Sequence, residues 1–122
     1  MSYSEYNMYG GFLIKEWRNE EGHLHREDGP AYIRIALHNK NQFVEYESYR
    51  CHGHTNGSIH RIDGPARIWY DSNGLVTREE FWISHERLGS DKEGFFVFWD
   101  LLSEEEKQNN NVLKLLIKYT SS

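Results

Sequence analysis

The sequence predicts an α+β protein that is mainly β, with an antiparallel sheet of β-hairpin repeats at residues 12–88 and a C-terminal helical cap at residues 90–120. Three observations predict this class: a duplicated motif, strand-like alternation around both copies, and helical spacing of apolar residues after Ser90. The length of 122 residues suits one domain, so we assign residues 1–122 to a single domain.

The duplicated motif is the most informative feature of the chain. Residues 21–34 are EGHLHREDGPAYIR and residues 56–69 are NGSIHRIDGPARIW, with eight identities in fourteen aligned positions. His25 and His60 mark a period of 35 residues. A fixed period of roughly 20 to 50 residues is typical of a repeat architecture, in which each unit packs against its neighbours.

The shared core, H-R-x-D-G-P-A, predicts a turn that leads into a strand. Aspartate favours turns, glycine tolerates the backbone before proline, and proline suits the first residue of a strand. We expect the histidines to bond the aspartates or nearby carbonyls. For the arginines we prefer pairing with acidic residues, the alternative being a ligand-binding row with one arginine per repeat. The predicted structural residues are His25, Arg26, Asp28, Gly29, Pro30, His60, Arg61, Asp63, Gly64 and Pro65.

Strands are expected on both sides of each turn. Residues 12–17 form a partial earlier unit, and alternating residues continue from Ala31 and from Ala66. Return strands rich in aromatic and β-branched residues follow at 42–50 and 75–83, the second after a strong Asn73-Gly74 hairpin signal.

The period becomes helical after Ser90. Asp91 is a plausible N-cap for a first helix whose apolar stripe contains Phe95, Phe98, Trp99 and Leu102. Ser103 and Glu106 form a capping box for a second helix, which residues 109–111 weaken or break. We expect its apolar side to pack on the open end of the sheet; that side comprises Val112, Leu113, Leu116, Ile117 and Tyr119.

Composition excludes several classes of protein. The 14 basic and 19 acidic residues give a formal charge of −5, which argues against direct nucleic-acid binding by bulk charge. No apolar run reaches the roughly 20 residues of a membrane span, and the first residues lack a signal-peptide pattern. The single cysteine, Cys51, excludes an internal disulfide and suits a reducing cytosol, so we expect a cytoplasmic protein.

The H-R-x-D-G-P-A core, preceded by G-x-[LI] and followed by an aromatic strand, resembles short repeat proteins of bacteriophage and bacterial genomes. These are similar in style to MORN-repeat proteins and to MORN-like antitoxins. The resemblance covers about residues 12–88, and the F-x-x-W-x-x-L-S-x-E-E segment at residues 96–106 recurs in such phage proteins. The chain departs from a true MORN unit, since its period is longer and Y-x-G and G-x-G signatures are missing. The resemblance implies a non-enzymatic β-hairpin repeat that binds another protein, in the cytoplasm of the host cell if phage-encoded.

Positions that differ between the copies are the better candidates for a binding surface, because turn geometry recurs in every unit whereas binding residues vary. Tyrosine, tryptophan and arginine are the residues most enriched at interface hot spots. The predicted protein-binding residues are Tyr32, Arg34, Tyr46, Tyr49, Arg67, Trp69, Phe81 and Trp82.

The seven histidines raise the question of a metal. His23 with His25, and His52 with His54, have the H-x-H spacing that places two imidazoles on one face of a strand. No carboxylate or cysteine stands at a second diagnostic spacing, so we predict no metal and no cofactor.

Catalysis is not predicted either. Cys51 and the adjacent His52 would point to opposite faces of a strand and so would not form a nucleophile–base pair. The carboxylates Glu79-Glu80 and Glu104 to Glu106 are expected on a solvated strand and in a helix first turn.

The leading functional hypothesis is a protein-binding module that masks a host or defence protein with its sheet. An acidic inhibitor of this kind could compete with nucleic acid for a basic target. Two alternatives stay open: an assembly protein that self-associates through its sheet, and a small enzyme or metal protein that uses the histidines.

Overall fold

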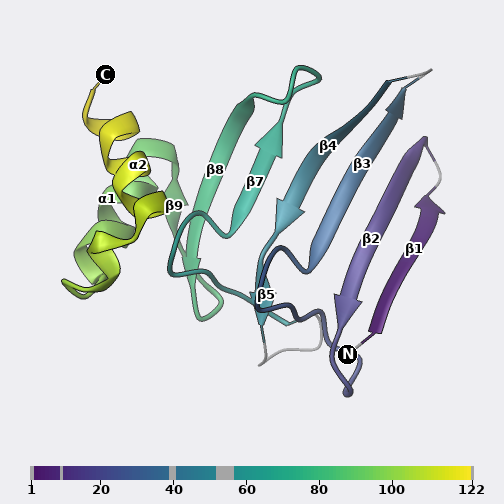
Figure 1. Ribbon diagram of the computed structural model, residues 1–122, viewed down its shortest axis with the longest axis horizontal. Helices are drawn as coiled ribbons and strands as arrows, with labels where there is room; N and C mark the ends of the chain where they lie inside the picture. Colours follow the sequence, from purple (N-terminus) through teal and green to yellow (C-terminus); the bar gives the residue numbers. More distant parts are fainter. Residues whose placement is uncertain (1, 9, 39–40, 52–56, 122) are drawn as a thin grey trace.

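The computed structural model describes residues 2–8, 10–38, 41–51 and 57–121 (Figure 1). It confirms an α+β fold that is mainly antiparallel sheet with two C-terminal helices. A seven-stranded sheet has the order β1-β2-β3-β4-β7-β8-β9, and β5 pairs with β6 in a separate ribbon. The strand bounds are β1 Ser2–Met8, β2 Phe12–Arg18, β3 Tyr32–His38, β4 Asn41–Ser48, β5 Arg50–Cys51, β6 Ser58–Ile59, β7 Arg67–Tyr70, β8 Val76–Ile83 and β9 Glu86–Ser90.

Strand order in the large sheet follows chain order, with the β5–β6 ribbon inserted between β4 and β7. Short turns join β1 to β2, β7 to β8 and β8 to β9, whereas residues 19–31 and 49–66 form longer connections. The predicted turn at Asn73-Gly74 joins β7 to β8, where Gly74 has a φ of 82°. The Asp71 carboxylate accepts hydrogen bonds from the backbone N–H groups of Asn73 and Leu75, at 2.8 and 3.1 Å. Short-range polar chemistry therefore sets this hairpin.

Strand β1 was absent from the sequence prediction. It pairs with β2 along its whole length, from Ser2 opposite Arg18 to Met8 opposite Phe12. All seven of its residues are exposed, because the strand lies at the edge of the sheet and no other element that the structure describes covers it. A strand without a buried side gives no clear apolar alternation, which is the signal that identifies strands in a sequence.

Two helices lie beside the β9 end of the sheet, α1 Asp91–Leu101 and α2 Asn110–Thr120 (Figure 1). Between them, Ser103 and Glu106 exchange the predicted capping-box bonds, at 2.8 and 3.1 Å, but start only a 3₁₀ turn at Glu106–Gln108. The helical conformation is then interrupted at Asn109, which is extended and whose side chain caps the start of α2. No helix among the described residues is long and apolar enough to cross a membrane.

Asp91 is not the N-cap that we predicted for α1. Ser90 holds that position, whereas Asp91 is the first helical residue, with a φ of 50°. The Asp91 carboxylate instead accepts a hydrogen bond from the backbone N–H of Glu79 in β8, at 3.0 Å. Tertiary contact with the sheet has therefore overridden the local capping preference at this helix start.

The main hydrophobic core joins β8 to the helices. It consists of Phe81, Phe95, Phe98, Leu102, Val112 and Tyr119. Phe81 is fully buried, with ring centroids 5.8 Å from Phe95 and 4.9 Å from Phe98. Ile117, expected on the apolar side of α2, is instead 65% exposed, because α2 turns its Val112 and Tyr119 toward the core.

A buried carboxylate fastens α2 to the sheet. Glu79 accepts a hydrogen bond from the Tyr119 hydroxyl and an ion-paired bond from the Lys118 amine, the latter at 2.6 Å. Burial and the contact with Glu79 raise the pKa of Tyr119. The expectation of a solvated strand at Glu79-Glu80 is wrong, since these residues are only 4% and 5% exposed.

Candidate functional site

One face of the large sheet gathers arginine and aromatic side chains. Residues directly opposite each other in paired strands share a face, and one cross-strand row runs Ile14, Arg34, Tyr46, Trp69, Arg78. A parallel row contains Glu16, Tyr32, Ser48, Arg67 and Glu80. We call the side of the sheet that carries these two rows the arginine face, and the opposite side, which carries Phe81, the helix face.

The guanidinium groups on the arginine face lie against aromatic rings. Arg34 is 5.5 Å from the Phe12 ring centroid and 5.3 Å from that of Tyr46. Arg67 is 5.4 Å from the ring centroid of Tyr46 and 5.0 Å from that of Trp69, and Arg78 is 5.6 Å from that of Trp69. Cation–π contacts of this kind hold the arginines in defined positions across the sheet.

Glu80 organises the β8 end of this face. Its carboxylate lies 3.4 Å from Arg67, 2.9 Å from Arg78 and 3.6 Å from Arg87, and accepts a hydrogen bond from the Trp82 indole at 3.1 Å. Burial acts to raise the pKa of Glu80, but the bonds from Trp82 and Arg78 and the charges of Arg67 and Arg87 outweigh it, so that its pKa is lowered. One carboxylate thus serves three arginines, and the cluster keeps an excess of positive charge.

We expect Glu80→Gln to lower the free energy of unfolding by about 2 kcal/mol at neutral pH, because hydrogen bonds to a charged group are lost in a buried site. The lowered pKa makes this stabilisation present above the ordinary pKa of glutamate, and it is lost as pH falls through the folded value. Urea unfolding should therefore show the two proteins converging in acid. A difference that does not change with pH would contradict this assignment; the exposed Glu86→Gln is the control.

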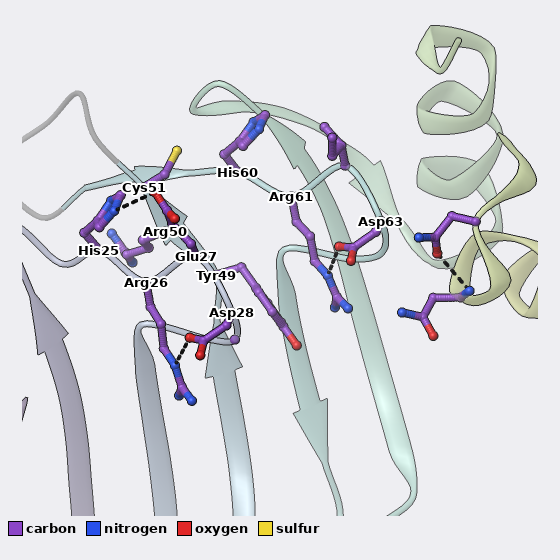
Figure 2. Close-up of a pocket in the computed structure, with 14 residues that line it drawn as sticks. His25, Arg26, Glu27, Asp28, Tyr49, Arg50, Cys51, His60, Arg61 and Asp63 are labelled. Atoms are coloured by element: carbon purple, nitrogen blue, oxygen red, sulfur yellow. Dashed lines mark hydrogen bonds and ion pairs between the residues drawn. The ribbon is translucent and has the colours of Figure 1, made fainter. Parts of the chain in front are cut away.

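The duplicated turns have the same internal bonds. In the first, Arg26 donates from Nε to Asp28 at 3.0 Å and from a terminal nitrogen to the Pro30 carbonyl at 3.2 Å. In the second, Arg61 donates to Asp63 at 2.7 Å and to the Pro65 carbonyl at 3.1 Å. Figure 2 shows the two arginines extending in the same direction, each beside its aspartate. The aspartates are thus bound by arginine, not by histidine as the sequence had suggested.

The same arginines pack on aromatic rings that precede them in the chain. Arg26 lies 3.9 Å from the Trp17 ring centroid, and Arg61 lies 3.9 Å from that of Tyr49. A Cβ at Gly29 or Gly64 would stand 2.9 or 2.8 Å from the guanidinium carbon. A side chain at either position would displace the guanidinium that folds back over the glycine. This geometry satisfies the two arginines within the fold.

The histidines of the turns have local roles. His60 Nδ1 accepts a hydrogen bond from the backbone N–H of Ser84, at 2.9 Å, and His25 is only 5% exposed, with Nε2 3.8 Å from Glu27. A groove of about 790 Å³ between the two turns is lined by residues of both, among them His25, Arg26, His60 and Arg61 (Figure 2).

The residues considered for metal and nucleophile chemistry lie only partly within the part of the chain that the structure describes. There, no group of three or more His, Cys, Asp or Glu side chains is placed to hold a metal ion. His52 and His54 lie outside the described residues, so the second H-x-H pair and the Cys51–His52 pair are not placed. Burial raises the pKa of the Cys51 thiol, which opposes formation of the thiolate nucleophile.

Six of the eight predicted binding residues belong to the arginine face: Tyr32, Arg34, Tyr46, Arg67, Trp69 and Trp82. Tyr46 is 6% exposed and supports the face from within, since its hydroxyl accepts a hydrogen bond from Arg67 at 2.7 Å.

Two predicted binding residues belong elsewhere. Tyr49 lies under Arg61 on the helix side, and Phe81 is a core residue. The prediction of Phe81 as a surface residue was wrong. Its ring packs between the sheet and the helices, and an aromatic residue in such a core looks the same in a sequence as one at a protein interface.

Sequence reasoning missed Phe12, Arg78, Glu80 and Arg87, which complete the arginine face. Alternation along the predicted strand 75–83 already placed Arg78, Glu80 and Trp82 on one side. The sequence did not show which residues lie opposite them in the neighbouring strands, because register is a property of the folded sheet.

No family model matches the chain, and neither a curated protein nor a solved structure matches it. The chemistry of the two faces and of the two turns is therefore the basis for a functional assignment.

Proposed function

We propose that this chain is a non-enzymatic protein-binding module that covers a target protein with its arginine face. The observation that carries the proposal is the concentration of half-buried arginine and tryptophan side chains on a face that no described element covers, whereas the helix face is partly covered by the helices. Tyrosine, tryptophan and arginine contribute most of the binding energy in protein interfaces. In this proposal the arginines of the duplicated turns are structural.

The proposal includes the architecture behind the face. We take the sheet to be a tandem array of MORN-like β-hairpins, of the kind that the sequence motif resembles in phage and bacterial proteins. The matching bonds of the Arg26 and Arg61 turns support this view. An inhibitor or antitoxin-like protein acting in the cytoplasm of a bacterial cell, on a host or defence protein, is the role that best fits such an array.

Capture from bacterial lysate tests the proposal. The bait is the intact chain, compared with a Trp69→Ala/Trp82→Ala double variant and with Ile117→Ala as a control that removes an exposed side chain from α2. We expect the wild type and the control to capture the same proteins, and the double variant to lose them, with folding of all three checked by thermal unfolding. The proposal would be overturned if the folded double variant captured the same proteins as the wild type.

Self-association is a second candidate, supported by a different observation. Strand β1 is a fully exposed edge of seven residues without proline or lysine, whereas the opposite edge, β9, is shorter and has a register shift opposite Phe81/Trp82. An unprotected edge strand can pair with a second copy. Native mass spectrometry of the purified bait separates the candidates, since a stable dimer would support self-association and a monomer would exclude it.

A further inference from the structure

Charge is divided unevenly between the two faces of the sheet. Six of the eight arginines belong to the arginine face, where the acidic partners seen among the described residues are Glu16, Glu45 and Glu80. The lysines of the described chain are on the helix face or in the C-terminal segment. A chain with a formal charge of −5 thus has one locally basic surface. The six arginines are Arg18, Arg34, Arg50, Arg67, Arg78 and Arg87.

The basic groups remain accessible. Arg78 and Arg87 side chains are 48% and 45% exposed, and Arg34 and Arg67 are 31% and 29% exposed. Arg67, Arg78 and Arg87 share the single carboxylate of Glu80, so their donors outnumber the acceptors of that carboxylate. Forked guanidinium donors in fixed positions are suited to bidentate bonds with carboxylates.

Four aromatic rings of this face, those of Phe12, Tyr46, Trp69 and Trp82, have one or more of these cations beside them. Arg34 lies between Phe12 and Tyr46, while Trp69 has Arg67 and Arg78 near it. A β-sheet that binds single-stranded nucleic acid by stacking presents open aromatic ring faces to the bases. Here a base would have to displace a guanidinium before it could stack on one of these rings.

We infer that the arginine face receives a carboxylate-rich segment of the partner protein. This inference rests on the proposed function and gives the partner a chemistry: aspartate and glutamate side chains bond the N–H donors of Arg78, Arg87 and Arg67 that the Glu80 carboxylate does not occupy. The Trp69 ring helps to hold two of these guanidinium groups, those of Arg67 and Arg78, in place. Complementary charge raises the rate of encounter and selects against basic partners. The inference reverses the expectation of an acidic inhibitor that binds a basic target.

Fluorescence anisotropy of a labelled oligoglutamate peptide, titrated with the intact protein, tests the inference. We expect binding that weakens as salt shortens the range of electrostatic attraction from about 10 Å at 0.1 M to about 3 Å at 1 M. Arg78→Gln/Arg87→Gln should weaken it about tenfold or more, which corresponds to about 1.4 kcal/mol. Lys92→Gln, which removes a charge from the exposed start of α1, should leave it unchanged.

The remaining outcomes separate the two levels of the proposal. Absence of oligoglutamate binding, or equal loss with Lys92→Gln, overturns the acidic-partner inference, while tryptophan-dependent capture from lysate would still support a protein-binding face. Tighter arginine-dependent binding of labelled oligothymidylate than of oligoglutamate overturns the inference in favour of nucleic acid. The proposed function itself is overturned if capture from lysate does not depend on Trp69 and Trp82.

Discussion

Phe81→Ala is expected to lower the free energy of unfolding by about 3 to 5 kcal/mol. The ring is fully buried between β8 and α1, and its removal leaves a cavity bordered by Phe95 and Phe98. Chemical denaturation followed by tryptophan fluorescence measures the change. Because the ring joins the sheet to the helices, we expect the packing of both to loosen together.

Two comparisons make this prediction specific to burial. Phe81→Leu keeps most of the volume and should cost less than about 1.5 kcal/mol. Leu75→Ala removes an aliphatic side chain that is 64% exposed and should change stability by no more than about 0.5 kcal/mol. A stable Phe81→Ala protein that loses only its binding partner would instead restore Phe81 to the interface.

Gly94→Ala is expected to destabilise the protein by about 2 kcal/mol or more, although alanine favours helices by about 1 kcal/mol over glycine. A Cβ at Gly94 would stand 2.3 Å from the carbonyl carbon and oxygen of Gly89, which are backbone atoms of β9. Relief requires α1 to move away from the strand, and that movement disturbs the core around Phe95.

Thermal unfolding of Gly94→Ala beside Val97→Ala measures this effect. Val97 lies in the same helix but is 45% exposed, so its truncation should change stability by no more than about 0.5 kcal/mol. An increase in stability for Gly94→Ala would mean that helix propensity outweighs the close approach of α1 to β9.

Local chemistry made much of the fold predictable. The Asn73-Gly74 hairpin, the break before α2 and the strands beside each turn follow from side chains a few residues apart. Strand β1 escaped prediction because its residues are exposed on both sides, so no apolar pattern marks it. The role of Asp91 was mispredicted because its carboxylate accepts a hydrogen bond from Glu79 in β8, twelve residues earlier, and no local pattern reveals that contact.

The candidate site divides in the same way. Variation between the two copies predicted most of the tyrosine, tryptophan and arginine residues of the arginine face. It did not predict the further residues that complete this face, such as Arg78 and Glu80. Arg78 meets Trp69, and Arg34 meets Tyr46, only through strand register. Net charge predicted an acidic protein and gave no sign that six arginines would share one face.

The sequence alone specifies the turns, since in each of them an arginine bonds the aspartate and the proline carbonyl within five residues. It also determined that strands precede helices, because the apolar period changes after Ser90. Only the tertiary structure decided which aromatics are core and which are surface. Phe81 and Trp82 are adjacent and both aromatic, yet alternation along β8 turns one toward the helices and the other toward Glu80. Burial depends on which element covers each face, and that information is not local.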